Sequence, residues 1–148
     1  VIPQSTLTRE QAMDYGNMVI CCPGASTSTS ESECHCDRHK GEKPISFTPL
    51  DKNFINTITY KTDGSICSTN SDYNKELNEI LNLNAAILKA NRKAVRKQLI
   101  NSLGKKDWKK GDLEKLIKVY SEKDRDGKKK EYCGVVLSYL TKKLQARA

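Results

Sequence analysis

The sequence is poor in aromatic residues and contains no long apolar run. Phe, Trp and Tyr make up 6% of its 148 residues. No apolar run is longer than about five residues, whereas a membrane-spanning helix needs roughly twenty. We therefore expect no transmembrane segment and only a small core, in one small domain or two tightly coupled halves.

The sequence also lacks the common catalytic motifs. It contains no Gly-rich phosphate loop, no G-x-S-x-G and no complete EF-hand loop. A ribonuclease-like hydrolase needs an acid/base pair and a cation on the phosphate, and here only His39 or His35, with Lys40 and Arg38, offers them. We expect a protein that is not an enzyme, with a small ribonuclease-like phosphodiesterase as the third alternative.

Net positive charge is confined to the C-terminal part of the chain. Residues 1–70 carry 6 Lys and Arg against 8 Asp and Glu, whereas residues 71–148 carry 20 against 10. Such asymmetry is typical of a protein with an anionic partner, although interspersed acids are also typical of an ordinary solvated helical surface. We divide the chain into a cysteine-bearing segment, 1–70, and a basic helical region, 71–148.

The N-terminal segment predicts one short helix and then a loop. Thr8 and Gln11 form a capping-box pattern at the start of residues 8–16. Residues 21–42 contain a Pro-Gly break and a Ser/Thr run with nothing to bury, so we expect a loop. Within it, Ser26–Ser32 is expected to be mobile and to tolerate deletion.

A small sheet is predicted next. Residues 45–50 and 53–60 are rich in β-branched and aromatic residues, which favour strands. Asp63 and Gly64 predict a hairpin turn before a further strand at residues 65–69.

Beyond Asn70 the apolar period changes to that of helices. Helical spacing predicts a long amphipathic helix over residues 71–104, with Asn84 and Asn91 marking a kink or buried polar contacts. Two further helices are expected, at residues 111–123 and 131–144. The predicted fold is α+β and predominantly helical, with a small N-terminal hairpin and a cysteine-rich loop packed on three basic amphipathic helices.

The six cysteines form an even set in a short chain, which favours disulfides. They are Cys21, Cys22, Cys34, Cys36, Cys67 and Cys133. Neighbouring cysteines rarely bridge each other, so we expect two bonds between the 21/22 pair and the 34/36 pair. The remaining bond then joins Cys67 to Cys133 and stabilises the protein by roughly 4 kcal/mol through loop entropy.

A zinc site is the alternative use of the same residues, and no other cofactor is expected. Cys22, or its neighbour Cys21, with Cys34, Cys36 and His39 supplies four ligands of the types that zinc prefers. The spacing fits no standard pair of zinc knuckles, so we rank zinc below disulfides. We expect both histidines to be exposed loop residues.

Five basic residues lie within an arc of about 140° on an ideal helix, nearly opposite the apolar stripe. They are Lys89, Arg92, Lys93, Arg96 and Lys97. With Trp108 they are the candidate binding residues, although Trp108 also fits a cap over the helix junction. We expect Arg92, Lys93 and Arg96 to be replaceable by Gln together without loss of the fold.

The sequence therefore predicts a small, disulfide-stabilised binding protein of the effector, toxin or ligand type, an inference from class alone. The partner is a protein or a polyanion, such as nucleic acid, a sulfated glycan or anionic lipid headgroups. Because the chain begins with Val1 rather than Met, we expect a removed export signal or a trimmed start, and a secreted protein that can act inside a host cell. The second alternative is a zinc-bearing nucleic-acid-binding module.

Overall fold

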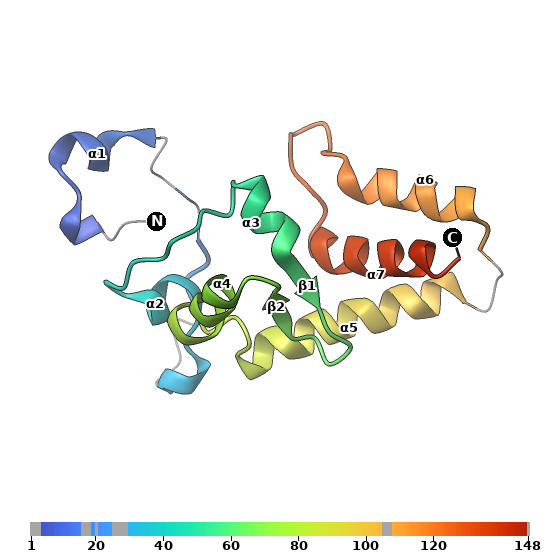
Figure 1. Cartoon of the computed structure of the whole chain (residues 1–148), viewed down its shortest axis with the longest axis horizontal. Coiled ribbons are helices and arrows are strands. Elements are labelled where there is room, and N and C mark those ends of the chain that lie inside the picture. The colour runs from blue at the N-terminus through green and yellow to red at the C-terminus, as the bar shows by residue number, and fades with distance from the viewer. Residues whose placement is uncertain (1–3, 16–18, 20, 25–29, 105–107, 148) are drawn as a thin grey trace. The chain divides into compact units, whose positions relative to one another are not determined.

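The computed structural model describes residues 4–15, 19, 21–24, 30–104 and 108–147. It confirms the predicted fold class, because the chain is α+β and predominantly helical with one small antiparallel sheet. The chain divides into two compact units (Figure 1). Unit 1 comprises Val1–Thr59 and Ile66–Leu88, and unit 2 comprises Tyr60–Ser65 and Lys89–Ala148.

Short helices make up most of unit 1. Its elements are η1 (Gln4–Thr6), α1 (Arg9–Met13), η3 (Glu31–Glu33), α2 (Cys36–Lys40), α3 (Lys52–Thr57), β1 (Ile58–Tyr60, whose last residue belongs to unit 2), β2 (Ile66–Ser68), α4 (Ser71–Lys75) and the π-helical turn η4 (Glu76–Ile80). The capping box at Thr8 is confirmed, and so is the hairpin between β1 and β2. The predicted loop at 21–42 is wrong in part, because α2 and η3 lie within it. Most of the predicted mobile stretch Ser26–Ser32 lies outside the described residues.

The strands predicted at residues 45–50 and 53–60 are wrong except for β1. Pro49 cannot donate to a sheet ladder, and the Asp51 side chain accepts from Asn53 N–H at 2.8 Å, which starts α3 instead. Phe47 stacks on Phe54 with ring centroids 3.8 Å apart. The aromatic residues of this segment therefore form a core with Ile45 and Leu77 rather than the face of a sheet.

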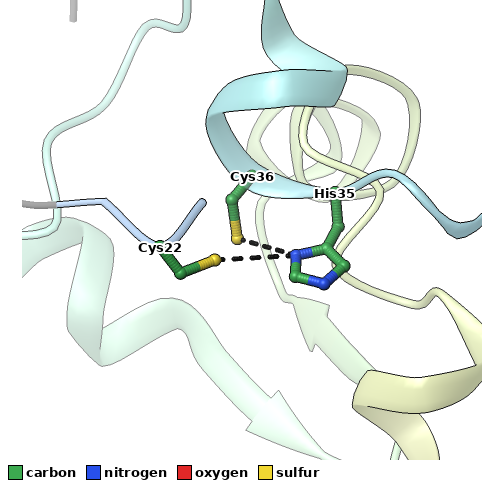
Figure 2. A group of neighbouring side chains, drawn as sticks. All are labelled: Cys22, His35 and Cys36. Carbon is green, nitrogen blue, oxygen red and sulfur yellow. Dashed lines mark hydrogen bonds between the residues drawn. The ribbon is translucent and has the colours of Figure 1, made fainter. Parts of the chain in front are cut away.

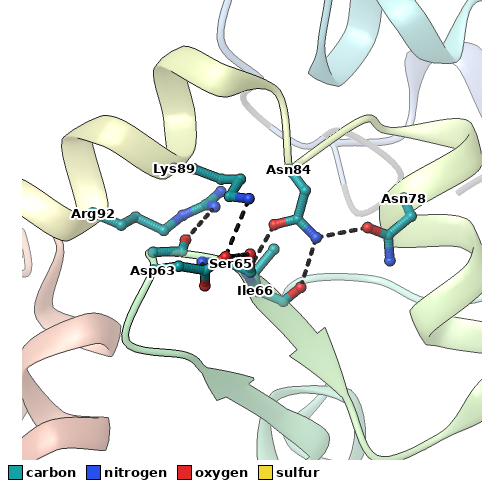
Figure 3. A network of polar contacts seen from close by, with 8 residues as sticks. Asp63, Ser65, Ile66, Asn78, Asn84, Lys89 and Arg92 are labelled. Carbon is teal, nitrogen blue, oxygen red and sulfur yellow. Dashed lines mark hydrogen bonds and ion pairs between the residues drawn. The ribbon is translucent and has the colours of Figure 1, made fainter.

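The predicted long helix over residues 71–104 is interrupted before α5 (Ala86–Leu103). Asn82 has a left-handed backbone with φ of 45°. The Asn84 side chain accepts from Ile66 N–H and donates to Ile66 C=O, both at 2.9 Å, so it pairs with β2 as a strand backbone would (Figure 3). The predicted role of Asn84 is confirmed, whereas Asn91 is exposed within an unbroken α5.

The described residues of unit 2 form three helices in addition to the segment Tyr60–Ser65. These helices are α5 from Lys89 onward, α6 (Lys110–Ser121) and α7 (Cys133–Gln145). α6 and α7 lie side by side (Figure 1). Their core joins Leu99, Leu103, Leu113, Val136 and Leu140. The helical spacing predicted both α6 and α7 correctly. None of the described helices is long and apolar enough to cross a bilayer.

Candidate functional site

Two thiols and an imidazole come together in unit 1, where the segment before Gly24 meets the start of α2 (Figure 2). The Sγ atom of Cys22 lies 3.6 Å from Nδ1 of His35. The Sγ atom of Cys36 lies 3.3 Å from the same nitrogen. All three atoms lie within 4.8 Å of one another. We call Cys22, His35 and Cys36 the thiol–imidazole cluster.

The backbone around this cluster is closely fitted. Gly24 has φ of +62°, and a Cβ atom there would lie 2.0 Å from His35 C=O. His35 N–H donates to Gly24 C=O at 3.3 Å, and Cys36 N–H donates to Leu81 C=O at 2.8 Å. Cys36 itself has φ of 54°, an uncommon conformation for a residue with a side chain. Such backbone strain persists where the surrounding structure fixes it, and it is concentrated at functional sites.

Asn82 holds the segment that precedes the cluster. Its Nδ2 group donates to Cys34 C=O at 2.8 Å and to Ser32 C=O at 3.1 Å. The residues following η4 therefore fix the position of His35, which is 8% exposed. The expected exposure of His35 is wrong, because these distant backbone contacts bury it.

The Cys21 thiol lies beside the cluster as well. Burial raises the pKa of the Cys36 thiol, and hydrogen bonds and charge repulsion from the Cys22 and then the Cys21 thiols raise it further. Cys21 is thus a neighbour of Cys36, whereas only Cys22, His35 and Cys36 lie close to one another as a group. Burial first, and then the neighbouring thiols, favour the protonated form of Cys36.

Two residues of the predicted zinc set lie outside the thiol–imidazole cluster. Cys34 Sγ donates to Ser30 C=O at 3.4 Å. Nδ1 of His39 lies 2.9 Å from Ile80 C=O, as a donor to it in the matching tautomer. The structure therefore groups Cys22 and Cys36 with His35 rather than with His39. Cys34 lies before α2, whereas Cys36 is the first residue of α2. The two side chains therefore have different partners.

The residues of the predicted hydrolase are divided among three places. Arg38 and His39 line a pocket of about 230 Å³ together with Glu31 and Cys34. Lys40 is buried, and its Nζ donates to Gly41 C=O at 3.1 Å. His35 belongs to the thiol–imidazole cluster.

All six cysteines lie in the described part of the chain, and each carries a free thiol. Two disulfide bonds are predicted between the 21/22 pair and the 34/36 pair. Cys36 lies beside Cys21 and Cys22, as one of these bonds requires. The disulfides, including the bond from Cys67 to Cys133, stay predictions.

The basic residues predicted on one face of α5 have different environments. Arg92 is 8% exposed, and its guanidinium donates to Gly64 C=O at 3.1 Å (Figure 3). Lys89 pairs with Asp63 at 3.1 Å. Arg96 lies over the Tyr139 ring, 5.3 Å from its centroid. The prediction that Arg92, Lys93 and Arg96 all face away from the packed side is therefore wrong, since two of them make contacts that fix the helix.

The turn beneath Lys89 is itself well ordered by polar contacts. Ser65 N–H donates to Asp63 at 3.0 Å and the Ser65 hydroxyl donates at 2.8 Å. These bonds, followed by Lys89, hold the pKa of the Asp63 carboxyl well below its usual range. The Lys89 ammonium group is therefore paired with a carboxylate of this turn.

Trp108 and the two remaining lysines complete the predicted binding set. Nε1 of Trp108 donates to Leu103 C=O at 2.8 Å, and its ring packs on the unit 2 core. Trp108 is therefore a cap over the junction between α5 and α6. Lys93 and Lys97, four residues apart on α5, are exposed.

The zinc set predicted from the sequence left out His35 and gave Cys21 as an alternative to Cys22. The signal for His35 was its position directly between two cysteines in Cys-His-Cys.

Comparison with protein-family models, with curated proteins and with solved structures finds no match to this chain.

Proposed function

We propose that the protein is a non-enzymatic binding protein that holds an anionic polymer on the basic surface of unit 2. The segregation of charge between the two units carries this proposal. Unit 2 contains 20 Lys and Arg against 8 Asp and Glu, for a net charge of +12. Unit 1 contains 6 against 10, for a net charge of −4. A field of one sign over one unit attracts a polymer of the opposite sign.

Most of the positive charge of unit 2 is available to solvent. Its exposed cations are Lys61, Lys93, Lys97, Lys109, Lys110, Lys115, Lys118, Lys123, Arg125, Lys128, Lys129, Lys130, Lys142 and Arg147. Only two of these are arginines, and lysine acts as a point charge rather than as a bidentate fork. This composition supports contacts to phosphate or sulfate groups.

The environment of Trp108 argues against recognition of single-stranded bases. Such recognition uses exposed aromatic rings on which bases stack, whereas Trp108 caps a helix junction. We therefore propose binding that depends on the charge of the polymer and not on its sequence. Nucleic acid and sulfated glycan share this chemistry. Export and an effector role stay predictions.

Affinity for a labelled DNA duplex is expected to fall steeply with salt. Each phosphate contact contributes about −0.9 to the slope of log affinity against log salt concentration. Replacing Lys93 and Lys97 with Gln should therefore shallow the slope by about two. Fluorescence anisotropy at several salt concentrations measures this slope, and parallel titration with heparin shows whether phosphate or sulfate binds more tightly.

The matched control replaces Lys43 and Lys52 with Gln. Both are exposed lysines of the acidic unit 1, so the change in total charge is the same while the slope should stay unchanged. Equal slopes for the two double variants would contradict the assignment to unit 2. Absence of binding to both duplex and heparin at low salt would refute the proposed function.

A further inference from the structure

A cation-binding geometry is present in the thiol–imidazole cluster. With zinc–sulfur bonds of about 2.3 Å and zinc–nitrogen bonds of about 2.05 Å, a tetrahedral site places sulfur and nitrogen about 3.6 Å apart. The two observed separations from His35 Nδ1, to Cys22 and to Cys36, are 3.6 and 3.3 Å. One separation equals the edge of a zinc tetrahedron, and the other is about 0.3 Å shorter.

The same nitrogen lies close to both sulfurs, as it would if all three atoms shared one metal ion. A neutral imidazole offers one acceptor nitrogen with one lone pair, so only one of the two thiols can donate well to Nδ1. A cation placed between the three atoms satisfies all of them. A disulfide between Cys22 and Cys36 gives no reason for a buried imidazole to be directed at both sulfurs (Figure 2).

The candidate for the fourth ligand is the Cys21 thiol, because Cys21 directly precedes Cys22 in the chain and is a neighbour of Cys36. Structural zinc sites are closed by four protein ligands, often three cysteines and one histidine. The segments that carry these ligands are held by Gly24, Leu81 and Asn82 through backbone and amide hydrogen bonds. The site is therefore built from three parts of unit 1 and does not depend on a single loop.

We propose that Cys21, Cys22, His35 and Cys36 bind one structural Zn²⁺ ion, with His35 ligating through Nδ1. On binding, the cysteines release their protons to solvent and coordinate as thiolates. The ion ties the segment at Cys21–Gly24 to the start of α2. This site differs from the zinc set that the sequence suggested, and it takes the place of the disulfides predicted between the 21/22 and 34/36 pairs. It is argued independently of the polyanion surface on unit 2.

The first test titrates the full-length chain, reduced and freed of metal, with Zn²⁺ and separately with Co²⁺. We expect one ion per chain and the intense visible absorption of tetrahedral cobalt bound by thiolates. Long-range ¹H–¹⁵N spectra should show that Zn²⁺ shifts Nδ1 of His35. The chain has two histidines, so His39→Asn assigns the signals.

Matched variants test the ligand set. Loss of an outer partner of a metal ligand lowers affinity by about 10- to 100-fold, so Cys36→Ser and His35→Asn, which remove ligands, should lower Zn²⁺ affinity by more than about 100-fold. Cys34→Ser and His39→Asn alter neighbouring residues whose polar atoms contact Ser30 and Ile80 instead. They should retain the Zn²⁺ affinity of the unaltered chain, because neither removes a ligand of the proposed site.

Three results would overturn the zinc site. One is the absence of stoichiometric binding by the reduced chain, and another is an equal loss in ligand and control variants. The third is a disulfide from Cys36 to Cys21 or Cys22 in protein purified without reductant, shown by peptide mapping. If circular dichroism shows that a variant is misfolded, the cobalt and histidine spectra of the unaltered chain still test whether the site binds the metal. Failure of duplex binding leaves these results unaffected, so the two proposals fail separately.

Discussion

Replacing Arg92 with Gln is expected to destabilise unit 2 by about 2 to 3 kcal/mol. A hydrogen bond from a charged group contributes about 1.5 to 3 kcal/mol, and the shorter side chain also gives up the packing of the Arg stem. Arg92 is buried and donates to Gly64 C=O. Trp108 is the single Trp of the chain and packs on the unit 2 core, so urea unfolding followed by Trp fluorescence reports this unit directly.

Lys93→Gln is the matched control, because it removes the same charge from the next residue of the same helix. Lys93 is exposed, and surface substitutions of this kind change stability by less than about 0.5 kcal/mol. A loss for Arg92→Gln no greater than that for Lys93→Gln would show that the guanidinium is not a structural contact. It would also return Arg92 to the set of binding residues.

Sequence periodicity predicts the elements whose stability is local. α6 and α7 each have an apolar stripe at helical spacing that packs on the unit 2 core, and the capping box at Thr8 depends on residues three apart. The Asp63–Gly64 turn is likewise encoded by neighbouring residues. In these cases local propensity and tertiary packing favour the same structure.

Contacts between distant residues explain what the sequence does not predict. Residues 45–50 have strand propensity, but Phe47 is buried against Phe54 and Tyr73, and this aromatic packing does not require a sheet. The helix expected through residue 84 is interrupted because Asn84 binds the backbone of Ile66, eighteen positions earlier. Neither partner can be identified from local spacing.

The candidate zinc site likewise has one feature that the sequence predicts and another that depends on distant residues. Spacing along the chain grouped Cys22 with Cys36 correctly. The predicted set took His39 rather than His35, although the spacing fits no standard pair of zinc knuckles. The choice depends on Asn82, which is 48 residues from Cys34 and fixes the backbone before His35. Such long-range contacts decide which of two histidines is turned toward the thiols.

Replacing Gly64 with Ala is expected to destabilise unit 2 by about 3 to 5 kcal/mol, among the largest effects of any single substitution. Gly64 has φ of +88°, and a Cβ atom there would lie 2.1 Å from Lys89 C=O and 3.1 Å from Lys93 N. The left-handed backbone alone costs about 1 to 2 kcal/mol for Ala. The clash adds to this cost because it is with the backbone of α5, which cannot move aside as a side chain can. Urea unfolding monitored by Trp108 fluorescence measures the loss.

Gly127→Ala separates the two contributions, because Gly127 has a similar φ of +76° but no atom within 4 Å of the added Cβ. Its expected loss is the conformational cost alone, about 1 to 2 kcal/mol. The difference between the two variants therefore measures how closely the turn approaches α5.

That approach also places Gly64 C=O at the Arg92 guanidinium, so Gly64→Ala and Arg92→Gln should be strongly non-additive in the double variant. Equal losses for Gly64→Ala and Gly127→Ala, with additive behaviour in the double variant, would show that the turn and α5 are not in contact in solution.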